Sequence, residues 1–198
     1  YHCFGCHSHG DVIKFVTETS GLSYKEAALK IAEENGIEIP KLTIAEKKKY
    51  DELERLTNVM DLATDYFHSS LNATVIEYLK NRGVNKEAID KFQIGFASRD
   101  RSIIDFFAEK SIKIEELEKV GLVVRRDNGR INEMFINRII FPIKNIYNKV
   151  VGFGGRVIDD SLPKYINSPE TLLFKKSETM FGENIAASSA HRKNRSIL

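Results

Sequence analysis

The sequence predicts an α+β protein: a small cysteine-containing module, then a helical segment, then a part built from antiparallel strands. Three observations support this prediction. Apolar residues recur at helical spacing through most of residues 11–120. Beyond Gly121 the pattern changes to short β-branched runs separated by Gly, Asn and Pro. The two cysteines, Cys3 and Cys6, are too close together for a disulfide framework and indicate metal or thiol chemistry.

The composition excludes two classes of protein. Among the 198 residues 42% are hydrophobic and 29% are charged, which is ordinary for a globular domain and excludes a disordered tail. The longest apolar run, Ile139–Ile143, contains Pro142 and is far shorter than the ~20 residues of a membrane span. The chain starts with Tyr1 and shows no targeting signal, so we expect an internal piece of a longer protein.

The charge is distributed unevenly along the chain. The net charge is +2, but residues 1–129 carry −3 and residues 130–198 carry +5. A basic C-terminal third favours a polyanionic partner.

Residues 1–40 are expected to form a module with two helices. Asp11 can cap the first helix, and Ser23 with Glu26 three residues later forms a capping box for the second. Gly36 can adopt the left-handed conformation that ends the second helix.

Residues 41–60 form a charged connector that we expect to be helical. Thr43 and Glu46 make another capping box, and the connector carries three consecutive lysines, Lys47 to Lys49, among several acidic residues. An apolar stripe continues from the connector into the next part, through Tyr50, Leu53, Leu56, Met60, Ala63 and Phe67.

Residues 61–198 begin with short helices and continue with strands. The expected helices are Val75–Leu79, a turn capped by Asn85, Ile103–Ala108 and Ile114–Val120. A meander is expected from the strands Leu122–Val124, Met134–Ile136, Arg138–Ile143 and Lys149–Val157, with a turn at Asp127-Asn-Gly129.

The C-x-x-C motif at Cys3 and Cys6 suits a structural zinc site, because Gly5 permits the sharp turn that aims both thiolates at one ion. Such a site needs four ligands, and the economical interpretation places two more upstream of Tyr1. His2, His7 and His9 are alternative ligands, although a tight loop rarely supplies a whole tetrahedral shell. A pair of thiols packed in a turn is the plain alternative. A thioredoxin-like redox pair fits less well, since no strand–helix–strand pattern surrounds it.

Residues 138–176 hold the densest functional signal. Gly152, Gly154 and Gly155 weaken a strand unless a backbone or a phosphate approaches closely. Side chains suited to phosphate binding, base stacking or hydrogen bonding follow at Arg156, Lys164, Tyr165, Asn167 and Ser168. The alternative is an ordinary meander with a glycine bulge and solvated lysines. Asp159 and Asp160 fit a solvated turn better than a metal site, because no third acidic residue lies nearby.

Several blocks together resemble the bacterial replicative primases, the RNA polymerases that start DNA strands. The N-terminal blocks are Tyr1-His-Cys-Phe-Gly-Cys6, Gly10-Asp11, Gly21-Leu-Ser23 and Asn35-Gly-Ile37, followed by Tyr78-Leu79, Arg82-Gly83 and Ile94-Gly95. The most distinctive blocks are Arg138-Ile-Ile-Phe-Pro-Ile143, Gly152-Phe-Gly-Gly-Arg156 and Pro163-Lys-Tyr-Ile-Asn-Ser-Pro-Glu-Thr171. The resemblance covers the whole chain.

The resemblance implies a domain plan. Residues 1–40 would be the C-terminal part of a CHC2-type zinc ribbon whose first Cys and His precede Tyr1, leaving Cys3 and Cys6 as zinc ligands. Residues 61–198 would be the basic N-terminal subdomain of the polymerase domain. The toprim subdomain, whose acidic residues hold Mg²⁺, would follow Leu198 and is missing from this chain.

The resemblance also implies roles for single residues. Template and nucleotide contacts would come from Arg138, Arg156, Lys164, Tyr165 and Asn167, and Lys175 would match the lysine of a Phe-x-Lys-Gly block, with Lys176 as a further cation. The chain departs from the family at Met134 and Ile136, where many members have basic residues.

The implied ligands are single-stranded DNA template and ribonucleoside triphosphates, and the implied partner is the replicative helicase, through a C-terminal domain outside this chain. The resemblance further implies a monomer in the bacterial cytoplasm, without a membrane anchor. Because ribonucleotide transfer needs metal ions, we expect this chain alone to make no primer. The alternative function is a non-enzymatic zinc-ribbon adaptor that docks on single-stranded DNA or on a replication protein.

Overall fold

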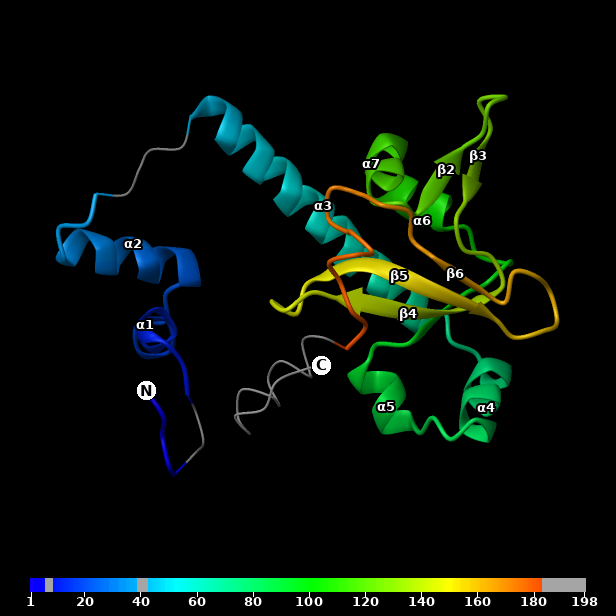
Figure 1. Ribbon diagram of the computed structural model, residues 1–198, viewed down its shortest axis with the longest axis horizontal. Coiled ribbons are helices and arrows are strands. Elements are labelled where there is room, and N and C mark those ends of the chain that lie inside the picture. Colours follow the sequence, from blue (N-terminus) through cyan, green and yellow to red (C-terminus); the bar gives the residue numbers. More distant parts are fainter. Residues whose placement is uncertain (6–8, 39–42, 183–198) are drawn as a thin grey trace. The chain divides into compact units, whose positions relative to one another are not determined.

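A computed structural model describes residues 1–5, 9–38 and 43–182 of the chain. The chain divides into two units, Tyr1–Lys47 and Lys48–Leu198, which are described separately (Figure 1). The described residues form helices and antiparallel sheets, as the predicted α+β class requires. None of the described helices is both long and apolar enough to cross a lipid bilayer.

The first unit contains two helices whose ends follow the predicted caps. Helix α1 spans Val12–Ser20, and Asp11 Oδ1 accepts a hydrogen bond from the Lys14 amide at 2.8 Å. Helix α2 spans Tyr24–Glu34 and starts with the capping box of Ser23 and Glu26.

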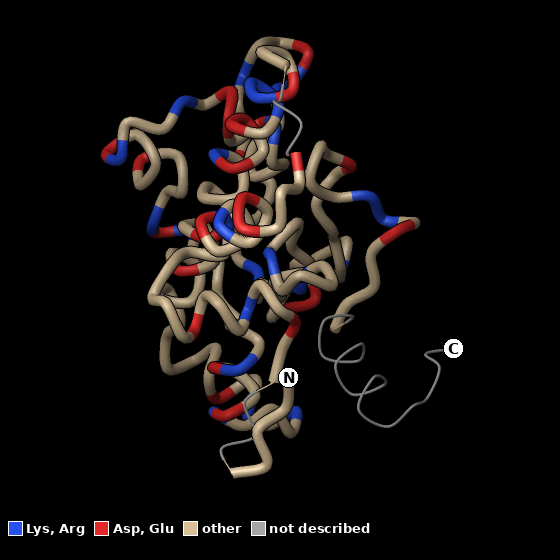
Figure 2. Tube along the Cα trace, turned by 90° about the vertical axis from the view of Figure 1, so that its left-hand side faces the viewer, with Lys and Arg blue, Asp and Glu red and all other residues tan. Residues whose placement is uncertain are grey.

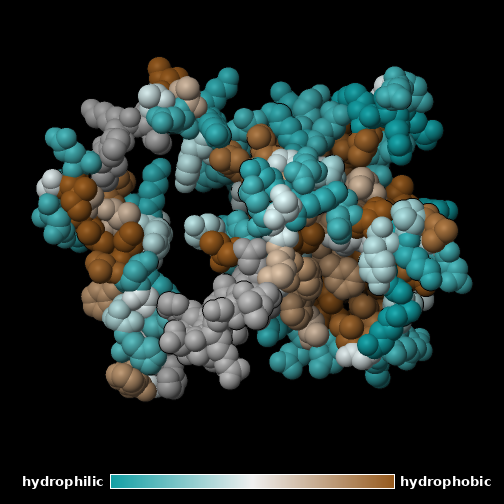
Figure 3. Space-filling view, in the orientation of Figure 1, coloured by the Kyte–Doolittle hydropathy of each residue, from teal (hydrophilic) through white to brown (hydrophobic). Residues whose placement is uncertain are grey.

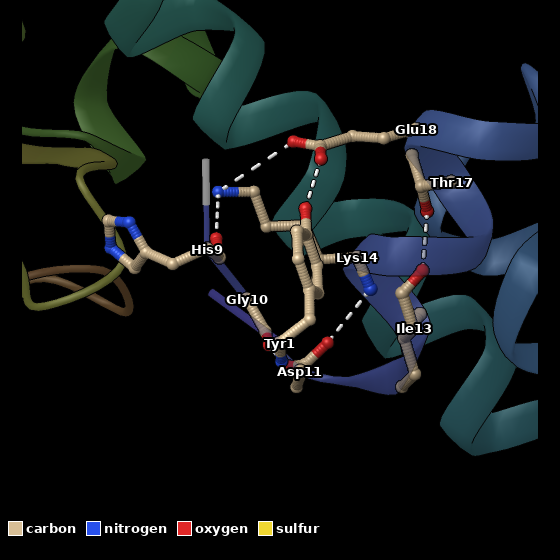
Figure 4. A network of polar contacts seen from close by, with 8 residues as sticks. All are labelled: Tyr1, His9, Gly10, Asp11, Ile13, Lys14, Thr17 and Glu18. Atoms are coloured by element: carbon tan, nitrogen blue, oxygen red, sulfur yellow. Dashed lines mark hydrogen bonds and ion pairs between the residues drawn. The ribbon is translucent and has the colours of Figure 1, made fainter. Parts of the chain in front are cut away.

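The chain before α1 is tied to that helix by polar contacts (Figure 4). The Gly10 amide donates to the Tyr1 carbonyl at 3.1 Å, and the Tyr1 hydroxyl donates to the Glu18 carboxylate. Lys14 Nζ donates to the His9 carbonyl at 2.9 Å. An isolated antiparallel bridge between His2 and His9 closes the loop that carries the C-x-x-C motif.

Helix α3 spans Ile44–Ser69 and contains residues 44–60 of the predicted charged connector, whose residues 41 and 42 lie outside the described residues. The capping box is present, since the Glu46 amide donates to Thr43 Oγ1 at 3.2 Å and Glu46 Oε2 accepts from the Thr43 amide at 2.8 Å. The second half of α3 is the central helix of the second unit. Its buried residues are Leu56, Val59, Met60, Ala63, Thr64, Tyr66 and Phe67.

Four short helices of the second unit lie close to the predicted segments. They are α4 (Ala73–Asn81), α5 (Lys86–Lys91), α6 (Ile103–Glu109) and α7 (Ile114–Lys119). The side chains of Asn72, Asn85 and Ser102 accept hydrogen bonds from backbone amides in the first turns of α4, α5 and α6.

The strands form two sheets rather than one meander. A four-stranded antiparallel sheet has the order β1-β4-β5-β6, and its strands are Gly95–Ala97, Arg138–Lys144, Val150–Val157 and Tyr165–Asn167. A separate ribbon pairs β2 (Val123–Arg125) with β3 (Ile131–Glu133). The edge strands β1 and β6 were not among the predicted strands.

The predicted strand Met134–Ile136 is wrong. The strand in this region is β3, which starts at Ile131, directly after a tight turn with Gly129 at φ 77°. Phe135 is buried in the core, and Asn137 adopts a left-handed φ of 54° that turns the chain into β4. The strand register is therefore determined by the turn. The apolar run that follows the turn does not determine it.

Helix α3 covers one face of the four-stranded sheet, and α4 and α5 cover part of the other (Figure 1). Phe153 of β5 packs with Phe67 of α3 and with Phe135, at ring-centroid distances of 5.4 and 6.3 Å. On the opposite face Ile139 and Phe96 join the core residues of α4 and α5. Part of this second face, along β5 and β6, is not covered by those helices and carries the site described next.

Candidate nucleic-acid interface

One face of β5 forms the floor of a groove at the edge of the sheet. The register pairs Gly154 with Asn167 and Arg156 with Tyr165, so these four residues share a face. The cavity has a volume of about 410 Å³, and its lining residues are Phe141, Ile143, Gly154, Gly155, Tyr165, Asn167, Phe174, Lys176, Thr179 and Phe181. Figure 3 shows apolar side chains at the surface of this part of the second unit.

The three glycines of β5 serve different purposes. A Cβ at Gly152 would meet the Phe174 ring at 3.0 Å, and a Cβ at Gly155 would meet the Phe135 ring at 2.6 Å. These two glycines therefore admit aromatic rings of the protein itself. Gly154 is partly exposed and lies beside the Asn167 amide, so it is the glycine that leaves the strand open to a ligand.

Arg156 is stacked between two tyrosine rings. Its guanidinium carbon lies 5.4 Å from the ring centroids of both Tyr78 and Tyr165, and its Nε donates to the Tyr165 hydroxyl at 2.8 Å. Arg82 lies over the Tyr78 ring at 5.0 Å. This alternation of cations and rings holds Tyr165 in place at the rim of the groove while leaving its side chain two-thirds exposed.

Sequence reasoning gave Tyr78 and Arg82 no role in the site, although both lie in blocks that carry the resemblance. Tyr78 belongs to α4 and Arg82 is the residue that caps its C-terminal end, more than 70 positions before Arg156 and Tyr165. No local signal connects a helix residue with a strand so far along the chain. Only the packing of α4 on the sheet brings them together.

Arg138 is buried and holds the chain that precedes β6. Its Nη1 donates to the Pro163 carbonyl at 2.9 Å. Close by, hydrogen bonds from the hydroxyl and the amide of Ser161 hold the pKa of Asp159 below its ordinary value. Asp159 therefore belongs to a turn, as the sequence favoured, and Arg138 supports the groove from inside the protein.

The two remaining predicted lysines do not line the groove. The Lys164 carbonyl accepts from the Val157 amide at 3.2 Å, which extends the β5–β6 pairing. Lys164 itself lies in a bend just before β6, is exposed, and is not among the residues that line the groove. Lys175 Nζ lies 3.0 Å from Glu178 Oε1, at the surface.

Lys176 lines the groove where Lys175 was expected to contribute. Lys176 is the second residue after Phe174 and is among the residues that line the groove, whereas Lys175 is not. The Lys176 amide donates to Glu170 Oε1 at 3.0 Å, which fixes the backbone at this point.

Ser168 is fully buried and exchanges two hydrogen bonds with Phe153, at 2.8 and 3.0 Å. It fastens the end of β6 to β5 and is unsuited to bind a ligand. The predicted residues that the structure brings together at the groove are therefore Arg156, Tyr165 and Asn167, joined by Lys176. Along most of the trace Lys and Arg lie among Asp and Glu (Figure 2), so the groove is distinguished by shape and ring stacking as well as by charge.

Of the two predicted zinc ligands, the structure describes only Cys3. Cys3 is exposed in the loop closed by His2 and His9, whereas Cys6 lies outside the described residues. Within residues 1–5, 9–38 and 43–182, no three His, Cys, Asp or Glu side chains gather as a metal site would require. Among the predicted ligands and their alternatives, the described residues include Cys3, His2 and His9, and these do not gather into a complete zinc shell.

Comparison with known families matches both parts of the chain. Residues 63–187 match the model of the DNA primase catalytic core, N-terminal domain, and residues 1–48 match the CHC2 zinc finger. The matches divide the chain near the boundary between the two structural units.

Individual relatives agree with these matches. The DNA primase of Rickettsia felis is 50% identical over 198 residues, which is 100% of this chain and 33% of that protein. The zinc-binding and RNA polymerase domains of the Aquifex aeolicus primase align with a TM-score of 0.66 at 32% identity, covering 97% of this chain and 47% of that one.

A third relative was solved with DNA. The RNA polymerase domain of the Mycobacterium tuberculosis primase, in complex with a double-stranded DNA oligomer with a 6-nucleotide overhang, aligns with a TM-score of 0.65 at 34% identity. The alignment covers 71% of this chain and 46% of that one. The chain spans about a third of the length of the curated relatives it matches. From its fold, its two family matches and these relatives, the chain belongs to the DNA primase catalytic core family, of which it carries the N-terminal domain preceded by CHC2 zinc finger sequence.

Proposed function

We propose that the chain is part of a bacterial DNA primase, which synthesises short RNA primers on single-stranded DNA, and that the groove on β5 and β6 binds the template strand. The observation that carries the proposal is the exposed Tyr165 ring, held in place by Arg156 at the rim of a cavity that Lys176 also lines.

The chemistry of the groove fits a single strand. A fixed aromatic ring can stack on any base, with about 1–3 kcal/mol per stacked base. Lys176 and the remaining N–H groups of Arg156 can pair with phosphates, and the Asn167 amide offers neutral donors and acceptors. These groups do not distinguish one base from another, so the proposed binding is mostly independent of sequence.

The neighbouring residues have supporting roles in this proposal. Arg138 positions the chain before β6 through the Pro163 carbonyl, and Arg82 with Tyr78 braces Arg156 from α4. Lys164 lies just before β6 and outside the groove lining, so it would contact only a DNA strand that continues past the edge of the sheet. We assign Lys175 no contact with DNA.

The proposal involves two metals, zinc in this chain and Mg²⁺ in another part of the parent protein. Cys3 and Cys6 are the proposed zinc ligands in this chain, in agreement with the CHC2 zinc finger match. The Mg²⁺ that nucleotidyl transfer needs would be held by a toprim subdomain elsewhere in the parent protein. Ribonucleoside triphosphates, the replicative helicase and a cytoplasmic location belong to the proposal for the parent protein.

The test is the affinity for an oligothymidylate, measured by fluorescence anisotropy at several salt concentrations. Tyr165→Ala should weaken binding by about 1–3 kcal/mol with little change in salt dependence, because it removes a stacked base. Lys176→Gln should lower the slope of log K against log salt by about 0.7, the value for one phosphate contact on a single strand.

Lys175→Gln is the matched control, because it removes the neighbouring charge outside the groove. Unchanged affinity and slope in both groove variants, or equal losses in Lys175→Gln and Lys176→Gln, would remove the groove assignment.

A further inference from the structure

A second cavity lies next to the groove, on the other side of Phe181. Its volume is about 240 Å³, and its lining residues are Lys91, Phe92, Pro142, Lys144, Asn148, Phe181 and Gly182. The end of the described chain brings Phe181 to α5 (Figure 1), where its ring stacks on Phe92 with centroids 6.0 Å apart. The same ring meets Phe141 edge-on at 6.4 Å, so Phe181 forms a wall common to both cavities.

The position of Lys144 in this second cavity is fixed unusually well for a lysine. Its Nζ donates to Gln93 Oε1 at 2.7 Å, in a partly buried contact between β4 and the loop after α5. Gln93 adopts a left-handed φ of 51°, and the pairing of β4 with β5 shifts between Ile143 and Lys144. The left-handed residue Gln93 and the irregular pairing at Lys144 are thus joined by one hydrogen bond. Backbone irregularities of these kinds concentrate at functional sites.

The charge of Lys144 is positioned without being neutralised by that bond. Gln93 is an uncharged acceptor, and an ammonium group has two further N–H donors. Lys91 lines the same cavity from the end of α5 and forms no ion pair with the other described residues. Two lysine side chains from different elements therefore line one small cavity, beside a pair of stacked aromatic rings.

We propose that this second cavity binds a phosphate ester, with Lys91 and Lys144 on the phosphate and the rings of Phe92 and Phe181 against its apolar substituent. Either a free nucleotide or a phosphate of a nucleic-acid strand that leaves the groove supplies this chemistry. The site stands on its own contacts and does not require the groove to bind template.

The test compares two probes on the whole chain, ATP and a long oligothymidylate, with a short oligothymidylate as reference. In Lys91→Gln/Lys144→Gln the affinity for one of the two probes should fall by about tenfold or more, since each lost bond to a charged group costs about 1.5–3 kcal/mol. A loss confined to ATP identifies a free nucleotide as the source. A loss confined to the long oligothymidylate, with a salt slope lower by about 1.4, identifies the strand.

A second variant tests the positioning of Lys144 without removing its charge. Gln93→Leu should lower the affinity for the same probe several-fold, while the slope of log K against log salt stays as in the unmodified chain. Unchanged binding in Gln93→Leu would overturn the positioning argument. Unchanged affinity for both probes in the double lysine variant would overturn the site, and so would an equal loss in Lys175→Gln. Variants at Tyr165 test template binding in the groove separately. A failure of the second cavity can therefore be distinguished from a failure of the proposed function.

Discussion

The two units of the chain stabilise their helices in different ways. In the first unit α1 and α2 bury only Ala27 and Ala32 among the described residues, and larger apolar side chains such as Val12 and Ile37 are exposed. In the second unit α3 alone buries seven side chains. The first unit therefore depends on contacts between residues close in sequence, whereas the second depends on a core assembled from distant segments.

The largest expected effect comes from emptying the core of the second unit. Phe153 is fully buried between Phe67 and Phe135, and Phe153→Ala should lower the free energy of unfolding of this unit by about 3–5 kcal/mol. This loss is measured by urea unfolding monitored by circular dichroism. Val12→Ala in the first unit is the control, because that side chain is two-thirds exposed. Similar losses in both variants would remove the contrast between the units.

A smaller effect is expected where α3 and β1 approach each other. A Cβ at Gly95 would lie 2.5 Å from the Phe67 carbonyl carbon and 2.7 Å from the His68 amide nitrogen. Backbone atoms cannot move aside, so Gly95→Ala should cost about 1–3 kcal/mol of unfolding free energy or more.

Gly154→Ala is the comparison for Gly95→Ala. Its Cβ would meet the end of the Asn167 side chain at 3.2 Å, and that side chain can turn away. The same urea titration should therefore show a smaller loss for Gly154→Ala. The reverse order would mean that the close approach of α3 and β1 does not limit stability.

In the first unit the expected effect is the loss of a single helix cap. Ser23→Ala removes the side chain that accepts from the Glu26 amide and should cost about 1 kcal/mol. Hydrogen exchange of the α2 amides should rise while that of the α3 core stays the same. Ser20→Ala, at the end of α1, is the control. Faster exchange throughout α3 would show that the units do not respond separately.

The smallest effect is a pH dependence of the same caps. Hydrogen bonds from Ser23 and from Thr43 lower the pKa values of Glu26 and Glu46. The stabilisation is complete above the unfolded-state pKa of about 4.3 and is lost as the pH falls through the lower folded-state pKa. Helicity of α2 should thus fall in acid, and Glu26→Gln should flatten that dependence. An identical acid profile in Glu26→Gln would assign the change to other groups.

The groove shows the same division between local and distant contacts. Arg156, Tyr165 and Asn167 could be chosen from the sequence because each lies in a dense block of phosphate-binding and stacking chemistry. Arg138, Lys164 and Lys175 carry the same chemistry in the same blocks. Arg138 is buried, Lys164 lies in the bend before β6 and Lys175 forms an ion pair outside the groove, and none of these properties is visible in a list of residue types.

By itself the sequence determined several helix caps, the two long strands and three of the groove residues, Arg156, Tyr165 and Asn167. Caps and strand alternation involve neighbouring residues, so the local sequence contains the necessary information. The tertiary structure alone decided that Tyr78 and Arg82 brace Arg156, that Phe174 fills the space over Gly152, and that Gln93 holds Lys144. Each of these contacts joins different elements of the fold, and burying apolar surface between those elements is what places their side chains together.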